Sequence, residues 1–247
     1  NVSYLFEASV GGGIPIIRPL SQCLAANEIE EICGILNGTT NYILTRMIRA
    51  GLSFDDALKE AQANGYAEQD PTADIEGHDA CRKICILASL AFGRHIYPDQ
   101  APTQGITGVR LADVAYAGSC GKKIKLLGRA IRRADGAVCA FVSPHLVDGE
   151  NPLAGVEDVF NAITVKGNAI GDVMFYGRGA GKLPTASAVV ADVIDAAKHL
   201  GKRKYLGWGP GGAGAAVPPE NVASQWYLRL ERDGEAVCAA FPKAERL

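Results

Sequence analysis

Closely paired apolar stretches are the strongest constraint on how this chain folds. Residues 123–133 and 138–147 lie on either side of Asp135-Gly136. An Asp-Gly dipeptide between two apolar stretches favours the two-residue turn of a β-hairpin, whose strands run antiparallel. The other stretches that we expect to be strands are residues 2–8, 29–36, 162–166 and 172–176, the last two joined by a turn that contains Gly167-Asn168. The middle of the chain therefore predicts a largely antiparallel sheet.

Helical patterns fill most of the chain on both sides of these strands. Ser53 and Asp56 have the spacing of a capping box at the start of a helix over residues 54–63. Asp74 is expected to cap a longer helix that reaches residue 92. Further helices are expected at residues 42–50 and 112–117, and another after Pro184-Thr185 that runs to His199. The whole pattern predicts an α+β fold, with a mixed, largely antiparallel sheet backed by helices.

The composition changes near residue 201 and divides the chain. Residues 1–200 are expected to form one folded unit, and residues 201–223 are rich in glycine and proline, as linkers are. Residues 224–247 predict one more hairpin, around Asp233-Gly234. The chain starts with Asn1 and almost at once with an expected strand, with no signal peptide, so we interpret it as a piece of a longer chain.

Charge and cysteine content exclude several classes of function. Lys plus Arg is 25 and Asp plus Glu is 27, so the net charge of −2 gives no reason to expect a nucleic acid or an anionic membrane as partner. No apolar run is long enough to span a bilayer. The seven cysteines are scattered, without the paired spacing of a zinc site. We therefore expect reduced thiols in a cytoplasmic protein.

The segment over residues 65–83 carries most of the recognisable chemistry, because it holds five carboxylates and one lysine close to basic and aromatic neighbours. Asp79 and Lys83 are four residues apart and share a helix face. Such a pair is common on solvated helices, and spacing alone favours that interpretation. The alternative is a lysine held between Glu68 and Asp79, which could exchange a proton with a carbonyl or alcohol oxygen.

Two glycine-rich loops allow two interpretations each. Residues 177–181 follow an expected strand and open a helix, as a phosphate-facing loop does, but a tight turn with backbones in close contact fits equally well. Glu7 precedes Gly11-Gly12-Gly13, where one carboxylate and inward-pointing carbonyls would suit a monovalent cation. A simple tight turn is the alternative here too.

Four long motifs, taken together and in this order, resemble homoserine dehydrogenase over about the first 200 residues. They lie at residues 6–15, 34–43, 65–83 and 177–188. The resemblance implies NAD(P)-dependent interconversion of L-aspartate 4-semialdehyde and L-homoserine, a step of threonine, methionine and isoleucine biosynthesis. It also implies a homodimer and a bound sodium ion.

The resemblance assigns roles to individual residues. It makes Lys83 the proton donor to the aldehyde oxygen. The residues that it places around the substrate are Glu68, Asp79, Asp74, Tyr66 and Thr39, and those beside the cofactor are Gly65, Gly179 and Gly181. The sodium ligands that it implies are the Glu7 side chain and the main-chain oxygens of Val10, Gly12 and Ile14.

The departures from the family pattern limit the expected activity. Family members begin with a Rossmann domain that contributes a GxGxxG loop and another active-site lysine, and this chain contains neither. Residues 1–200 thus resemble the substrate-binding, catalytic and dimerisation half, which we expect to be inactive by itself, and residues 224–247 resemble at most the start of an ACT-like domain. The alternatives are a stand-alone, non-catalytic dimer or amino-acid-binding module of the same fold, and a related dehydrogenase for another aldehyde.

Overall fold

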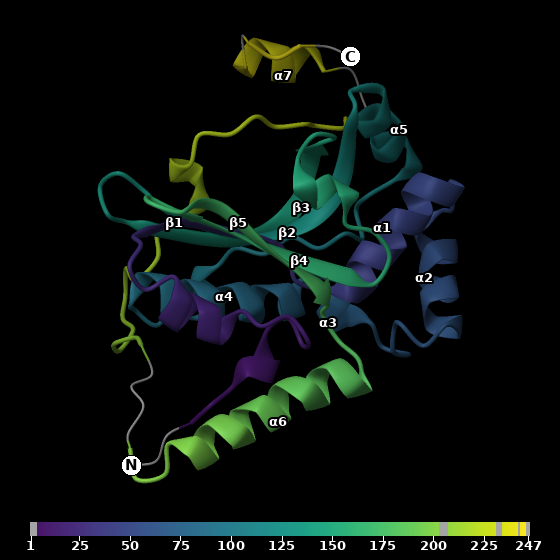
Figure 1. The fold of residues 1–247 in the computed structure, drawn as a ribbon. Coiled ribbons are helices and arrows are strands. Elements are labelled where there is room, and N and C mark those ends of the chain that lie inside the picture. The colour runs from purple at the N-terminus through teal and green to yellow at the C-terminus, as the bar shows by residue number, and fades with distance from the viewer. Residues whose placement is uncertain (1–3, 203–206, 231–233, 242, 246–247) are drawn as a thin grey trace.

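The computed structural model describes residues 4–202, 207–230, 234–241 and 243–245 (Figure 1). A five-stranded sheet lies at its centre, in the order β3-β2-β1-β4-β5, and all neighbouring strands are antiparallel. The strands are β1 (Ile29–Ile35), β2 (Lys122–Arg132), β3 (Val138–Asp148), β4 (Phe160–Gly167) and β5 (Gly171–Arg178). The two hairpins predicted for the middle of the chain are confirmed, as is the α+β fold with its largely antiparallel sheet.

Helices cover one face of this sheet and a smaller group of side chains covers part of the other. The helices are α1 (Gly38–Ala50), α2 (Phe54–Ala63), α3 (Thr72–Ile75), α4 (His78–Phe92), α5 (Leu111–Ser119), α6 (Lys182–Lys198) and α7 (Glu235–Ala240). Ile32 of β1 packs in one buried cluster with Leu44 of α1 and Ile84 of α4. The next residue, Cys33, packs in a separate cluster with Leu153 of η4 (Pro152–Gly155). Burial on both faces explains why β1 is so apolar near its end.

The helix α6 lies apart from the sheet, beside the first described residues (Figure 1). The short turn η1 (Glu7–Ser9) contacts it, and Asp192 of α6 accepts a hydrogen bond of 2.8 Å from the Glu7 amide. The same carboxylate forms an ion pair of 2.7 Å with Arg18. Among the described residues, no helix combines the length and the apolar character needed to cross a membrane.

The predicted cap of α2 is confirmed. Ser53 is extended (ψ 160°), and its hydroxyl accepts a hydrogen bond of 3.2 Å from the Asp56 amide and donates one of 2.6 Å to the Asp56 carboxylate. It thereby satisfies one of the amide groups that an α-helix leaves without a partner at its start.

Ser53→Ala is expected to lower the free energy of unfolding by about 1 kcal/mol, because the amide at the start of α2 loses its acceptor. Chemical denaturation followed by circular dichroism measures this. Ser119→Ala is the matched control, since the Ser119 hydroxyl lies at the exposed end of α5, where it donates to the Tyr116 carbonyl and contacts the Cys120 thiol instead of capping the start of a helix. Equal effects of the two substitutions would contradict the assigned cap.

Two expectations near the start of helices and strands are wrong. The strand expected over residues 2–8 falls partly outside the described residues, and Glu7 to Ser9 form a 3-10 turn instead. Asp74 does not cap the long helix, because the left-handed backbone of Gly77 (φ 82°) separates the short helix α3 from α4. The Asp74 side chain accepts a hydrogen bond from a distant asparagine, which is described below.

The hairpin predicted for residues 224–247 is also wrong. Asp233 and its neighbours 231 and 232 lie outside the described residues, but Glu235–Ala240, expected to be mostly strand, forms the helix α7. Its alanines and the glutamate in its first turn favour a helix, and one isolated hairpin has little stability in water. The division into residues 1–200, 201–223 and 224–247 stays a prediction.

Candidate functional site

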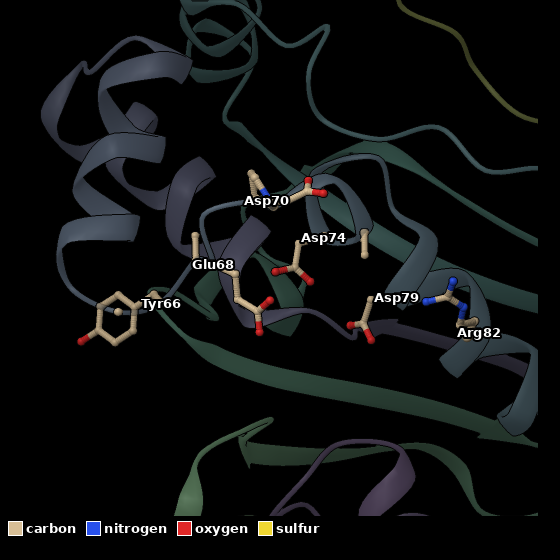
Figure 2. Close-up of a pocket in the computed structure, with 10 residues that line it drawn as sticks. Tyr66, Glu68, Asp70, Asp74, Asp79 and Arg82 are labelled. Atoms are coloured by element: carbon tan, nitrogen blue, oxygen red, sulfur yellow. The ribbon is translucent and has the colours of Figure 1, made fainter.

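A pocket of about 350 Å³ opens where the loop after α2 meets α3 and the start of α4 (Figure 2). Its lining residues are Gly65, Tyr66, Ala67, Glu68, Asp70, Pro71, Ala73, Asp74, Asp79 and Arg82. Five of the residues that the resemblance assigned to substrate and cofactor are therefore brought together here. This volume suits a small ligand.

Carboxylates dominate this pocket. Figure 2 shows the carboxylates of Glu68, Asp74 and Asp79 turned toward one space, whereas the Tyr66 hydroxyl points away from it. Asp70 is used locally, because it accepts hydrogen bonds of 2.6 and 3.1 Å from the Thr72 hydroxyl and amide. These bonds hold the pKa of the Asp70 carboxyl below its usual value. Three carboxylates around one space favour a ligand with a positive charge.

An asparagine joins two of these carboxylates to the predicted catalytic lysine. Asn37 is the N-cap of α1, and its side-chain nitrogen donates hydrogen bonds of 2.7 Å to Asp74 and 2.9 Å to Asp79. The same Asp79 oxygen accepts a bond of 2.7 Å from Lys83 Nζ, which also donates to the Leu36 carbonyl at 3.1 Å. Lysine has three donors, and two of those of Lys83 are used by these oxygens within the described part of the chain, which leaves one N–H for a ligand.

The surroundings of Lys83 differ from those of the solvated ion pair that spacing alone favoured. Its side chain is 19% exposed and is anchored at two oxygens, so it is not a solvated surface residue. Within the described part of the chain, it forms an ion pair with Asp79 and none with Glu68. Lys83 does not itself line the pocket but contacts the lining residue Asp79. Of the two carboxylates expected to flank Lys83, Asp79 forms the ion pair.

Thr39 supports the pocket from behind. Its hydroxyl donates a hydrogen bond of 2.7 Å to the Tyr66 carbonyl, while the Tyr66 ring packs against Tyr42 with 4.9 Å between centroids. Thr39 itself is buried and is not a lining residue. We interpret Thr39 as the residue that holds the Tyr66 loop on α1.

The two glycine-rich loops contact each other. The Gly13 amide donates a hydrogen bond of 3.1 Å to the Arg178 carbonyl. A Cβ on Gly12 would overlap the Gly179 carbonyl, and a Cβ on Gly179 would overlap the Asn161 amide. Gly12 and Gly179 are therefore needed for close backbone packing, which was the simpler of the two interpretations.

Asn161 lies between the contact of the two glycine-rich loops and the start of α1. Its side chain is buried, and its Oδ1 atom has no hydrogen-bond partner among the described residues. A Cβ on Gly38, next to the N-cap of α1, would lie 3.6 Å from that oxygen.

The space beside the three predicted cofactor glycines differs. Around Gly65 nothing lies within 4 Å of an added Cβ, and around Gly181 only Pro184 does, at 3.5 Å or more. There is thus open space on the Cβ side of Gly65 and Gly181, whereas the Cβ side of Gly179 is filled by Asn161, and the roles of all three glycines beside the cofactor stay predictions.

Glu7 has a structural role that needs no cation. Its carboxylate is buried and accepts hydrogen bonds of 2.7, 2.9 and 2.9 Å from the amides of Ile16, Ile17 and Arg18. A carboxylate at this place satisfies the free amides that precede the π-helical turn η2 (Pro19–Cys23). The sodium site with Val10, Gly12 and Ile14 stays a prediction.

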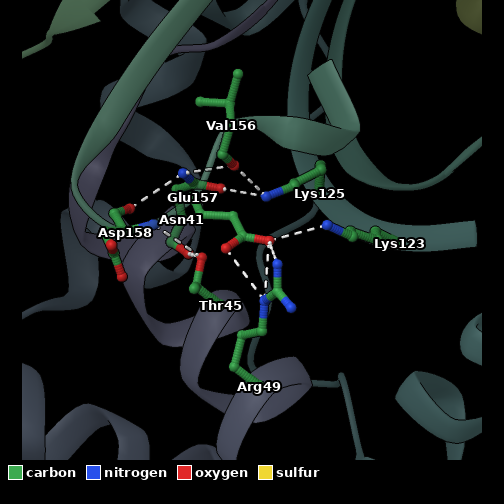
Figure 3. Close-up of polar contacts among 8 residues, drawn as sticks. All are labelled: Asn41, Thr45, Arg49, Lys123, Lys125, Val156, Glu157 and Asp158. Carbon is green, nitrogen blue, oxygen red and sulfur yellow. Dashed lines mark hydrogen bonds and ion pairs between the residues drawn. The ribbon is translucent and has the colours of Figure 1, made fainter. Parts of the chain in front are cut away.

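A buried lysine on β2 escaped the sequence analysis. Lys125 is 1% exposed and donates hydrogen bonds to the Val156 carbonyl and, at 3.0 Å, to Asn41 Oδ1 (Figure 3). Burial lowers its pKa from 10.5 to about 8, with a further decrease from Lys123 and Arg49 and an opposing effect of Glu157 and Asp158. Asn37, Asn41 and Lys125 were missed because each is an ordinary residue in its own segment.

The stability of the chain is expected to depend on this lysine at alkaline pH. Between about pH 8 and pH 10.5 the unfolded chain binds the Lys125 proton and the folded chain has released it. Raising the pH through this range therefore increases the free energy of unfolding, by on the order of 3 kcal/mol.

Urea denaturation at several pH values, compared between the wild type and Lys125→Met, isolates this contribution. As the pH rises from 8 to 10.5, the free energy of unfolding of the wild type is expected to increase relative to that of Lys125→Met. A difference that stays constant over this range would contradict the lowered pKa of Lys125.

Comparison with known proteins identifies the family. A model of the family described as homoserine dehydrogenase matches residues 15–194, most of the chain. The chain belongs to the homoserine dehydrogenase family. The family is one of oxidoreductases, and the resemblance seen in the four motifs is confirmed.

Individual members of the homoserine dehydrogenase family align with most of this chain, but the aligned region is only part of each member. The homoserine dehydrogenase of Synechocystis sp. is 53% identical over 198 residues, which are 79% of this chain and 46% of that protein. A crystal structure of a homoserine dehydrogenase from Thiobacillus denitrificans has a TM-score of 0.75 at 50% identity and covers 77% of this chain and 44% of that one. The chain spans about half the length of the curated relatives it matches.

One solved relative is described with a cofactor. A hyperthermophilic archaeal homoserine dehydrogenase mutant in complex with NADPH has a TM-score of 0.66 at 34% identity, covering 78% of this chain and 55% of that one. The fold of this chain is thus shared with a family member that binds a nicotinamide cofactor.

Proposed function

We propose that this chain supplies the substrate-binding half of a homoserine dehydrogenase, which interconverts L-aspartate 4-semialdehyde and L-homoserine with NAD(P). The observation that carries the proposal is the contact of Asn37, Asp79 and Lys83 at the edge of a carboxylate-lined pocket. Family membership supports the same reaction.

The pocket suits the amino end of this substrate. Both compounds carry an α-ammonium group, and the carboxylates of Glu68 and Asp74 turn toward the space that it would occupy (Figure 2). The neighbouring Arg82 lines the same pocket and could bind the substrate carboxylate. An amino acid is therefore a better fit than an uncharged aldehyde.

Lys83 is placed to handle the proton of the reaction. When the aldehyde carbon accepts a hydride, its carbonyl electron pair moves to the oxygen, which then needs one proton. The ammonium of Lys83, oriented by Asp79 and the Leu36 carbonyl, would donate that proton and end as a neutral amine. In the reverse direction Lys83 accepts the proton of the homoserine hydroxyl.

The described residues fit part of a nicotinamide cofactor site. Gly65 borders the pocket and Gly181 begins α6, and both leave the space that a bound group would need. The cofactor, when bound, supplies or accepts the hydride. We propose that Gly65 and Gly181 lie beside it, that Gly179 serves packing instead, and that the rest of the cofactor site lies in the half of the relatives that this chain does not span.

Calorimetric titration of the chain tests the substrate. We expect L-homoserine to bind and 4-hydroxybutyrate, which lacks the amino group, to bind at least about tenfold more weakly, because it leaves the carboxylates without a cation. Glu68→Gln is expected to weaken L-homoserine binding by about tenfold. Asp70→Asn is the matched control, because the Asp70 carboxylate is held by Thr72.

Equal binding of both compounds, or equal effects of the two substitutions, would overturn the assigned substrate orientation. For the reaction, we expect NADPH oxidation with L-aspartate 4-semialdehyde by the full-length protein that carries these residues, and none by residues 1–247 alone. Binding of homoserine without turnover in the full-length protein would favour a non-catalytic amino-acid-binding module. The homodimer stays a prediction that analytical ultracentrifugation tests.

A further inference from the structure

Lys125 is an unusual residue for its position. It is almost fully buried, and its two hydrogen-bond acceptors, the Val156 carbonyl and Asn41 Oδ1, are both uncharged (Figure 3). The nearby carboxylate of Glu157 is instead bound by Lys123 and Arg49. A buried cation with neutral partners is unfavourable for stability, and an apolar side chain of similar length would fill the same space. Packing alone therefore does not explain a lysine here.

Asn41, which accepts the bond from Lys125, is buried and connects α1 to the segment that leads into β4. The side-chain nitrogen of Asn41 lies 3.2, 3.0 and 3.1 Å from the carbonyls of Val156, Asp158 and Phe160, while its oxygen accepts the bond from Lys125. Asp158 has a positive φ of 55°, a conformation that aspartate adopts more readily than most residues other than glycine. Asn41 thus links α1 to the segment before β4 through three of its carbonyls.

Asn41 also lies in the first turn of α1, directly behind the candidate site. Its own amide donates a bond of 3.3 Å to the carbonyl of Asn37, the N-cap whose side chain contacts Asp74 and Asp79. A shift of this turn relative to the sheet would move the Asn37 side chain away from Asp79. One side of the turn therefore faces the pocket, and the other side is bound to Lys125.

We propose that Lys125 is a positioning residue, which through Asn41 holds the first turn of α1 against the sheet so that Asn37 reaches the Asp79–Lys83 ion pair. Lysine suits this role because its long side chain extends from β2 to both the α1 turn and the Val156 carbonyl. The effect on catalysis rests on the proposed function, but the positioning itself does not.

Amide hydrogen exchange and NMR of the chain test the positioning without an activity assay. In Lys125→Met we expect the backbone amide of Thr40, which is bonded to Asn37 Oδ1 at 2.9 Å, to exchange about tenfold faster. The side-chain amide signal of Asn37 is expected to shift as its bonds to Asp74 and Asp79 lengthen. Amides of α6, which lies apart from the sheet and contacts η1, should exchange as in the wild type (Figure 1).

Lys123→Met is the matched control. Lys123 lies two residues earlier on the same strand and bonds to Glu157 rather than to Asn41, so the Thr40 and Asn37 signals should stay as in the wild type. Asn41→Leu is a second variant that removes the same link, and it should change the same signals even if Lys125→Met does not fold. Unchanged Thr40 exchange in Lys125→Met or in Asn41→Leu, or equal changes in Lys123→Met, would overturn the proposal.

The catalytic consequence is measured separately in the full-length protein. If Lys125 positions the site, Lys125→Met should lower kcat with a smaller effect on KM, because Asn37 contacts the Asp79–Lys83 pair that handles the proton. Changed amide signals in a protein without any dehydrogenase activity would refute the proposed function while leaving the positioning intact.

Discussion

Lys83→Met is expected to lower kcat/KM for L-aspartate 4-semialdehyde by about 100- to 10,000-fold in the full-length protein. Methionine keeps the length of the side chain but cannot protonate the oxygen that becomes negative as the hydride arrives. The initial rate of NADPH oxidation measures the effect. L-Homoserine binding by the chain should change far less, because the Glu68 and Asp74 carboxylates remain.

Lys59→Met is the control for this substitution. Lys59 lies on the surface of α2, with its side chain 75% exposed and only a loose ion pair of 3.9 Å with Asp56. It should have wild-type kinetics. A Lys83→Met enzyme that kept more than a tenth of the wild-type kcat/KM would rule out Lys83 as the proton donor.

Gly179→Ala is expected to destabilise the chain by about 3 kcal/mol or more, because the new Cβ would overlap the Asn161 amide in a region where the loop at Gly12 leaves no room to move. Gly12→Ala should act similarly, since its Cβ would overlap the Gly179 carbonyl and its backbone is left-handed (φ 53°). Chemical denaturation measures both effects.

A double-mutant cycle with Asn161→Ala separates this overlap from other causes. The destabilisation by Gly179→Ala should be smaller in the Asn161→Ala background, because the overlapping amide is then absent. Gly118→Ala on α5 is the control, as nothing lies within 4 Å of its added Cβ. Strictly additive effects of Gly179→Ala and Asn161→Ala would show that the two residues do not compete for the same space.

The elements that could be predicted are those with local signals. The turn at Asp135-Gly136 and the cap at Ser53 depend only on residues within a few positions, and both are confirmed. The spacing of Asp79 and Lys83 predicted their contact, because a helix brings residues four apart together. The resemblance assigned Tyr66 and Glu68 to the substrate site, and both residues line the pocket.

The errors arose where a local signal competes with the chain around it. Aspartate is a residue type that often caps helices. The long helix α4 begins only after Gly77, however, three residues beyond Asp74, and the Asn37 side chain binds the Asp74 carboxylate. The hairpin expected at residues 224–247 had turn residues, but the alanines and the first-turn glutamate of its second half favour a helix, and this part forms α7. A tertiary contact decided the first outcome, and helix propensity favoured the second.

The sequence by itself determined the two hairpins of the sheet, the cap of α2 and the family of this protein, since these follow from short-range backbone preferences and from the order of its motifs. Only the tertiary structure decided how the site is held. Asn37 contacts Asp79 across 42 residues and Lys125 contacts Asn41 across 84. No local pattern encodes such pairs, because a buried asparagine or lysine acquires its role from the side chains that folding brings to it.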